Sequence, residues 1–153
     1  MNENQQLVEK FYAAFQAKDG KAMTDCYHAE AAFSDAVFPD LHGADVGRMW
    51  RMLCASGRDL RVESSNIQAR GEGVSAHWDA YYTFSATGRR VHNSINASFE
   101  FKAGLIYRHH DDFSFYRWAS QALGPIGRLL GWTPLIKNKV RRTAASNLAK
   151  FKG

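Results

Sequence analysis

The chain has 153 residues, of which 45% are hydrophobic and 13% aromatic, and this composition suits one domain with a sizeable core. No apolar run approaches the roughly 20 residues that span a bilayer, and the first residues lack the basic and apolar regions of a signal peptide, so we expect a cytoplasmic protein. The formal net charge is +5, and the basic residues are concentrated late in the chain. Because they are interspersed with apolar residues and no nucleic-acid-binding motif accompanies them, we expect no nucleic-acid partner.

Two helices and a short strand are predicted at the start of the chain. Asn2 or Asn4 can cap a first helix, whose apolar stripe ends near residues 18–20. Asp19 can cap a second helix that continues to about residues 28–30, and residues 32–37 follow as a short strand.

The third predicted helix has the clearest periodicity. Its apolar residues stand at i, i+3, i+4, i+7 and i+8, from Val46 to Cys54, and Gly57 ends it. We expect such a stripe to lie on a sheet. The two cysteines, Cys26 and Cys54, lie on apolar helix faces, so they are predicted to be core residues rather than a disulfide or a metal site.

Extended segments dominate the middle of the chain and predict an antiparallel meander. Apolar and polar residues alternate in them, and short glycine-containing turns separate them. The segments are 60–69, 74–84, 90–101 and 105–115. Helical sequence returns at about residue 118, is broken at 124–125 and 131–134, and ends in a basic amphipathic helix with an apolar residue at every fourth position from Ile136 to Leu148.

In the last two extended segments, polar residues occupy some of the alternating positions that otherwise hold apolar residues. Asn93 lies among Val91, Ile95 and Phe99, while His109 and Asp111 alternate with Leu105, Tyr107, Phe113 and Phe115. A carboxylate that faces a core must be hydrogen-bonded, paired or protonated. The pattern therefore predicts either a pocket with polar groups at its end or a satisfied buried network without chemistry.

Local signatures, in this order, resemble the nuclear-transport-factor-2-like fold, and within it SnoaL-like proteins, ketosteroid isomerases and limonene epoxide hydrolases. The signatures are Phe11-Tyr12-Ala13-Ala14-Phe15, the Asp19-Gly20 break before Met23 and Tyr27, Ala32-Phe33-Ser34-Asp35, and Gly104-Leu105-Ile106 leading to Asp111 and Phe113. The resemblance covers roughly residues 5–118 of a single domain, 1–153. It implies an α+β fold with a cone-shaped, strongly curved antiparallel sheet wrapped around the N-terminal helices, here with an extra C-terminal amphipathic helix over about 118–153.

The resemblance implies an incomplete set of catalytic residues. Asp35 falls at the position of the general-base aspartate of ketosteroid isomerases, but their oxyanion-hole positions fall at Phe11 and at Asn96 or Ala97. The late aspartate of limonene epoxide hydrolases falls at Asp111, whereas their arginine and first aspartate fall at Trp78 and Ala80. Asp111 also matches the single late carboxylate of SnoaL-type cyclases.

Parity and resemblance together predict an apolar cavity with a few polar groups, which is the usual composition of a small-molecule site. The candidate catalytic residues are Asp35, Asp111 and His109, with no metal and no cofactor. The expected ligand is a small hydrophobic molecule with a polar group. The residues expected to contact it are Phe11, Tyr12, Phe15, Trp50, Trp78, Tyr82, Asn93, Ile95 and Phe99.

Three functions are compatible with these residues. The first is an acid–base enzyme of isomerase, cyclase or hydrolase type, in which Asp35 or Asp111 moves a proton and His109 orients or shuttles it. The second is a binding or carrier domain, in which Asp35 only helps a turn and Asp111 only partners His109 or Tyr82. The third is an interaction module whose basic tail contacts a membrane or a partner.

Two further expectations concern surfaces. The simpler account of the tail is that Trp132, Ile136 and Val140 pack over the mouth of the cone or on the sheet, and we favour it over membrane contact. The other face of the meander carries residues of intermediate polarity, which suit the contact of a homodimer. These are Tyr81, Thr83, Ser94, Asn96 and Ser98.

Overall fold

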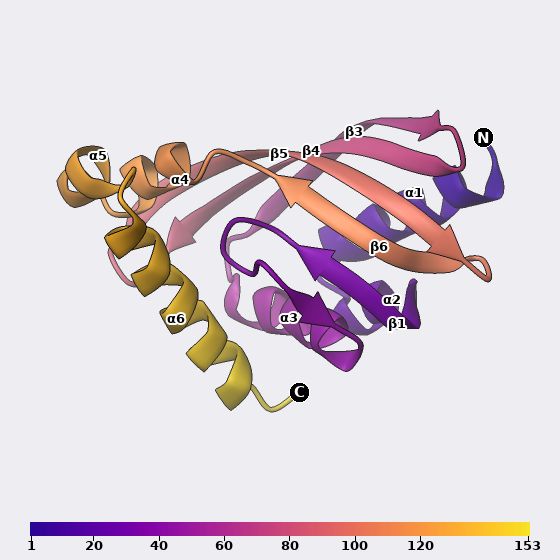
Figure 1. Ribbon diagram of the computed structural model, residues 1–153, viewed down its shortest axis with the longest axis horizontal. Coiled ribbons are helices and arrows are strands. Elements are labelled where there is room, and N and C mark those ends of the chain that lie inside the picture. Colours follow the sequence, from indigo (N-terminus) through magenta and orange to yellow (C-terminus); the bar gives the residue numbers. More distant parts are fainter.

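The computed structural model describes all 153 residues and contains six helices and one curled, open sheet of six strands (Figure 1). The sheet arches over the first three helices, and the last three helices lie at one end of it. In chain order the elements are α1 (Glu3–Gln16), α2 (Gly20–Thr24), β1 (Tyr27–Ser34), β2 (Leu41–His42), α3 (Ala44–Ser56), β3 (Arg61–Arg70), β4 (Gly73–Phe84), β5 (Arg89–Lys102), β6 (Leu105–Asp112), α4 (Phe115–Ala122), α5 (Pro125–Leu130) and α6 (Pro134–Lys150).

The strand order in the sheet is β2-β1-β6-β5-β4-β3. Strands β3 to β6 form the predicted antiparallel meander, and the α+β cone-shaped fold is confirmed. One pairing differs from the prediction, because β1 runs parallel to β6. Strand β1 reaches β6 from the N-terminal helices rather than through a hairpin, so the sheet is mixed.

The N-terminal helices fill the concave side of the sheet. Asn2 caps α1 in a capping box with Gln5, and α1 buries Val8, Phe11 and Phe15 in the main core. Gly57 ends α3, as predicted. The cysteines are free; Cys26 is buried and Cys54 packs at the edge of the core, so their expected role as core residues is confirmed.

The boundaries of two predicted elements are wrong. Helix α2 ends at Thr24, and the strand predicted for 32–37 begins earlier, at Tyr27, because the Tyr27 backbone pairs with β6 at Ile106. The last predicted strand, 105–115, ends at Asp112, since the Ser114 side chain caps helix α4.

A bulge in β6 changes which residues face the core. Glu100 pairs with Arg108 but Phe101 pairs with Ile106, so Tyr107 is an extra residue in β6. Ile106 is therefore fully buried, while Leu105 and Tyr107, which strict alternation assigned to the core, are half-buried. Beyond the bulge the alternation is restored, and it buries His109 and Asp111.

Helices α4 and α5 lie at one end of the sheet, and α6 runs from there toward α3 (Figure 1). Helix α5 fits closely against α4 because residue 127 is glycine; a Cβ there would lie 1.9 Å from the Ala119 carbonyl oxygen. Arg48 of α3 donates hydrogen bonds to the carbonyl oxygens of Leu148 (2.9 Å) and Phe151 (2.6 Å) and so fixes the end of α6. No helix is long and apolar enough to cross a membrane.

The expected packing of the tail is confirmed in part. Ile136 and Val140 of α6 pack against a second apolar cluster formed by β5 and α4, which includes Val91 and Trp118. Trp132 does not pack there, because 72% of its surface is exposed.

Candidate functional site

A buried chain of hydrogen bonds crosses the core of the cone. It joins Trp50 of α3, Tyr27 at the start of β1, and His109 and Asp111 of β6. The Trp50 Nε1–H donates to the Tyr27 hydroxyl oxygen (2.8 Å), which lies 2.7 Å from His109 Nδ1. His109 Nε2 lies 2.8 Å from Asp111 Oδ1. The parity of β6 therefore placed a histidine and a carboxylate in the core together, as the sequence predicted.

The direction of the hydrogen bonds follows from the donors available. An indole N–H can only donate, so the Tyr27 hydroxyl accepts from Trp50 and has its own proton free to donate to His109 Nδ1. The His109 Nε2–H then donates to the Asp111 carboxylate. With this assignment every polar hydrogen of the hydrogen-bonded chain has an acceptor. The Nε2–H tautomer of His109 therefore follows from the network. Burial, followed by the nearby Asp111 charge, raises the pKa of Tyr27 well above 10.0, so its hydroxyl stays protonated.

Two buried polar atoms next to this chain have no partner. They are the Asp111 Oδ2 oxygen and the Tyr12 hydroxyl. Asp111 Oδ1, in contrast, accepts from His109 and, at 3.4 Å, from the Trp78 Nε1–H. Burial, then the charges of Asp111 and Tyr27, raises the pKa of Tyr12 well above 10.0. Tyr12 therefore offers a proton and Asp111 offers a lone pair, and leaving such groups unsatisfied costs about 1–3 kcal/mol each.

Asp35 lies just after β1 and is half-buried. Its Oδ1 accepts from the backbone N–H groups of Val37 (2.8 Å) and Phe38 (2.6 Å), which is the turn-forming role that the structural alternative proposed. The Oδ2 atom takes no part in that turn. Burial raises the pKa of Asp35 from 3.8 to about 6; the Phe38 backbone hydrogen bond lowers it, and the Asp111 charge raises it further. The Asp111 charge therefore contributes to the raised pKa of Asp35.

Aromatic rings surround the His109 imidazole. The ring centroid of Phe99 lies 4.2 Å from that of His109, and that of Phe33 lies 4.9 Å away. The Trp50 indole stacks nearly parallel to the imidazole, with centroids 6.0 Å apart. This shell keeps water from the histidine and strengthens its electrostatic interactions.

Most of the residues expected to contact a ligand are buried in this one core. They are Phe11, Tyr12, Phe15, Trp50, Trp78, Ile95 and Phe99. Tyr82 is half-buried near α4, where its hydroxyl accepts from the Trp118 Nε1–H (2.6 Å). Asn93 is half-buried on β5 and its side chain makes no hydrogen bond. Their contact with a ligand stays a prediction.

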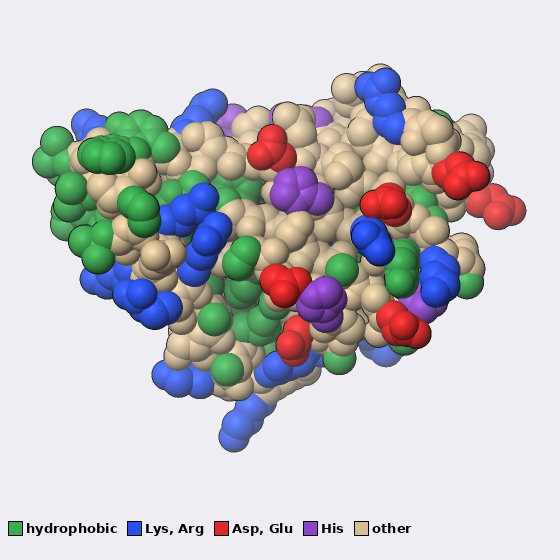
Figure 2. Space-filling view, viewed as in Figure 1, with side chains coloured by type: hydrophobic (Ala, Val, Ile, Leu, Met, Phe, Trp, Pro, Cys, Tyr) green, Lys and Arg blue, Asp and Glu red, His purple; other side chains and the backbone are tan.

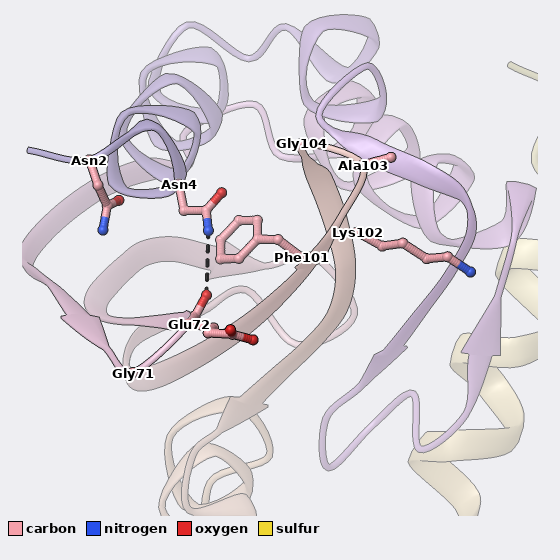
Figure 3. Close-up of a pocket in the computed structure, with 8 residues that line it drawn as sticks. All are labelled: Asn2, Asn4, Gly71, Glu72, Phe101, Lys102, Ala103 and Gly104. Carbon is pink, nitrogen blue, oxygen red and sulfur yellow. Dashed lines mark hydrogen bonds between the residues drawn. The ribbon is translucent and has the colours of Figure 1, made fainter.

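A surface depression of about 390 Å³ lies at the other end of β6 (Figure 3). The start of α1 and the turns after β3 and β5 form it, and Asn4 crosses it by donating to the Glu72 carbonyl oxygen at 3.4 Å. Its lining is mostly polar, and it contains neither of the candidate carboxylates. We therefore place the candidate site at the dyad, which means His109 and Asp111, together with Asp35 and Tyr12.

The comparisons with known proteins agree with this architecture. A model of the SnoaL-like domain matches residues 8–109, which is most of the chain and includes His109. The chain belongs to the SnoaL-like family. No curated protein matches the sequence of this SnoaL-like protein.

Several solved structures share its fold. An LEH-like epoxide hydrolase from M. tuberculosis is 22% identical, with a TM-score of 0.62 over 88% of this chain and 95% of that one. A candidate polyketide cyclase from Xanthomonas campestris is 21% identical, with a TM-score of 0.65 over 78% and 96%. An NTF2-like protein of unknown function from Burkholderia pseudomallei is 18% identical, with a TM-score of 0.64 over 74% and 92%. At these identities the likeness shows the fold.

Sequence reasoning missed two features of this SnoaL-like protein. It assigned no role to Tyr27, which it placed in a helix, so the hydrogen-bonded chain behind His109 was not foreseen. It also did not foresee that His77 and His92, on adjacent strands, both hydrogen-bond to Asp79 on the outer face of the sheet. The signal that could have linked them is that alternation places His77, Asp79 and His92 on the same face of two adjacent strands. No group of three His, Cys, Asp or Glu side chains is arranged to hold a metal ion.

Proposed function

We propose that this SnoaL-like protein is a cofactor-free acid–base catalyst that acts on a small hydrophobic molecule carrying a polar group. The observation that carries the proposal is the fully buried Asp111 carboxylate, which is oriented by His109 and retains one oxygen without a partner. An unpaired polar atom in a core is costly, and such atoms are retained where they act on something else.

Asp35 is the proton acceptor in this proposal. A carboxyl with a pKa of about 6 is mostly ionised at neutral pH, yet it is a stronger base than an ordinary aspartate. The hydrogen bonds from Val37 and Phe38 to Oδ1 fix the position of the Asp35 carboxylate. Its Oδ2 makes no bond in this turn, so this oxygen can accept a proton from the substrate. General bases of this kind accelerate proton transfer by about 10²–10⁴-fold.

The dyad and Tyr12 hold the polar group of the substrate. The Tyr12 hydroxyl donates to a substrate oxygen, and Asp111 Oδ2 accepts from a substrate or water O–H. The chain from Trp50 through Tyr27 fixes the His109 tautomer, so the dyad needs no reorganisation when charge moves at Asp35. A proton next to a carbonyl or a comparable activating group is the kind that such a site can remove.

A carrier function is the second candidate, and the packing of the dyad favours it. Phe99 and Phe33 lie against His109, so a ligand held by Asp111 would be shielded from reaction with water. In a carrier, Asp35 and Asp111 would bind the polar group without moving a proton.

Proton abstraction can be tested with 5-nitrobenzisoxazole, a small apolar probe. When a base removes its C3 proton, the N–O bond breaks and a coloured cyanonitrophenolate forms. We expect saturable turnover by the wild-type protein and a loss of about a hundredfold in kcat/KM for Asp35→Asn. Asp40→Asn, which removes an exposed carboxylate five residues away, is the matched control and should keep the wild-type rate. Equal rates for wild type and Asp35→Asn would exclude Asp35 as the base and leave the carrier function.

A further inference from the structure

Exposed apolar side chains gather at the end of the molecule where α4, α5 and the start of α6 meet. We call this patch the apolar tip, and it consists of Tyr116, Ile126, Leu129, Leu130, Trp132 and Leu135. Apart from Met1, these are all of the large hydrophobic side chains that the structure leaves exposed, and Leu129 and Leu135 are 71% and 70% exposed. Figure 2 shows the patch as a cluster at the end occupied by α5 in Figure 1. A contiguous patch of this kind marks an interaction surface.

The apolar tip is held by hydrogen bonds and is part of the fold. The Trp132 Nε1–H donates to the Leu129 carbonyl oxygen (2.9 Å), so the polar edge of the indole is satisfied and the rest of the ring faces outward. The Tyr116 hydroxyl donates to the Arg128 carbonyl oxygen at 2.8 Å. Thr133 caps α6 immediately after the exposed indole. The side chains are therefore exposed in a fixed arrangement.

The charge around the apolar tip has one sign. No acidic residue follows Asp112, and none of the basic side chains in this part of the chain forms an ion pair. Two of the basic side chains are half-buried, since Arg141 donates to the Ala36 carbonyl oxygen and Lys137 lies over the Phe115 ring. The exposed ones on α4, α5 and the first part of α6 are Arg117, Arg128, Lys139 and Arg142, whereas Lys150 and Lys152 lie at the far end of α6. Figure 2 shows basic side chains bordering the apolar cluster.

We propose that the apolar tip docks this protein on the surface of an anionic phospholipid bilayer. Leu129, Trp132 and Leu135 enter the boundary between headgroups and acyl chains, where tryptophan is favoured. The neighbouring lysines and arginines then face the headgroups, and each contributes about a fivefold gain in binding through its attraction to anionic lipid. Apolar insertion and basic attraction are the two features that surface-docking helices combine.

The charge distribution argues against two other occupants. A second copy of the chain placed tip to tip would bring two uncompensated positive patches together, and like charges oppose such a contact. A nucleic acid would neutralise the basic residues but leave the Trp132 and Leu129 side chains against phosphate and water. An anionic bilayer matches both the charge and the apolar surface.

Co-sedimentation with vesicles tests the proposal. The full chain is mixed with vesicles of phosphatidylcholine and phosphatidylglycerol, or of phosphatidylcholine alone, at low and at high salt. We expect binding to the anionic vesicles that weakens at high salt and is much weaker on phosphatidylcholine alone.

Two double variants separate the contributions. Leu129→Ser/Trp132→Ser removes apolar insertion, and Lys139→Glu/Arg142→Glu reverses charge without touching a hydrogen bond of the fold. Each should lower the partition coefficient by at least about tenfold while keeping the wild-type circular dichroism spectrum, since the Trp132 side chain hydrogen-bonds only within its own loop. Lys10→Glu/Arg58→Glu changes the net charge equally but lies on α1 and after α3, and it should bind as the wild type does. Absence of vesicle binding, equal binding to both lipids, or binding unaffected by either tip variant would overturn the proposal.

Discussion

His109 Nε2 and Asp111 Oδ1 lie 2.8 Å apart, and the two side chains are 0% and 1% exposed. Two polar side chains so far from water are maintained only when each satisfies the other, because removing one leaves the second without a partner. The pair is therefore a structural element of the core as well as the centre of the candidate site.

Replacing Asp111 tests the structural part of this account. Asp111→Ala leaves the His109 Nε2–H and the Trp78 Nε1–H without an acceptor, so we expect the free energy of unfolding to fall by about 3 kcal/mol. Asp112→Ala removes the neighbouring exposed carboxylate and should change stability by less than about 0.5 kcal/mol. Urea unfolding of both variants measures the difference, and equal losses would show that the buried pair is not special.

The two buried tyrosines should respond differently to loss of the hydroxyl. Tyr27→Phe leaves the Trp50 Nε1–H and His109 Nδ1 unpaired and should cost about 2 kcal/mol. Tyr12→Phe removes a hydroxyl that has no partner, so stability should stay constant or rise, while turnover of 5-nitrobenzisoxazole falls. Thermal unfolding and the probe assay, run on both variants, check this. A larger loss of stability in Tyr12→Phe than in Tyr27→Phe would contradict the proposed network.

Asp35 should make stability depend on pH. Its pKa is raised from 3.8 to about 6, so between these values the folded chain binds more protons than the unfolded chain. Stability therefore falls as pH rises through this window, and the ionised group costs at most about 3 kcal/mol above it, less the screening that its partial exposure allows. Asp35→Asn keeps an oxygen for the turn, so it should be more stable than wild type at pH 8 but not at pH 4. Urea unfolding at both values measures this; a pH-independent difference would contradict it.

The same coupling predicts a shift in the pH–rate profile. The Asp111 charge raises the pKa of Asp35, so Asp111→Asn should move the midpoint of the probe reaction below about 6. Asp112→Asn, with the same change in net charge, should leave the midpoint in place. A midpoint that moves equally in both variants would show that net charge, rather than proximity of the two carboxylates, sets it.

Two leucines of α6 distinguish its packed side from its exposed start. Leu148 is buried against the core, so Leu148→Ala should lower the free energy of unfolding by about 2–3 kcal/mol. Leu135 is exposed, and Leu135→Ala should change it by less than about 0.5 kcal/mol. Chemical unfolding checks both values, and a large loss at Leu135 would mean that the apolar tip is covered in solution.

Homodimer formation through the outer face of the sheet stays a prediction. Ser98 is exposed in the middle of β5, so Ser98→Arg should disrupt a sheet-to-sheet contact without disturbing the fold. We expect a dimer in sedimentation equilibrium for the wild type and a monomer for the variant. A monomeric wild type at micromolar concentration would remove the expectation.

The elements that sequence predicted well are those with a strong local pattern. The stripe from Val46 to Cys54 and the alternation from Val74 to Phe84 need only local periodicity, and both were confirmed. Tyr27 was misplaced because its strand depends on pairing with β6, which lies far away in sequence. The same holds for the Tyr107 bulge, since it is a property of two strands.

The candidate site was likewise predictable only where a local sequence pattern determines it. Parity on one strand was enough to place His109 and Asp111 in the core. Tyr12 and Trp50 were expected at the site, but the hydrogen bonds that join Trp50 and Tyr27 to His109 depend on how α3 and β1 lie against the sheet, which parity on one strand does not determine. Trp132 was expected to pack because it is apolar, but its outward direction is set by a hydrogen bond within its own loop.

The most direct test of the candidate site is a crystal structure of the Asp35→Asn variant with 5-nitrobenzisoxazole, which that variant should bind without converting. We predict that the probe lies inside the cone, with an acceptor atom within hydrogen-bonding distance of the Tyr12 hydroxyl and its C3–H directed at residue 35. A probe bound only in the depression between Asn4 and Glu72, or elsewhere on the surface, would contradict an acid–base site at Asp35 and Asp111.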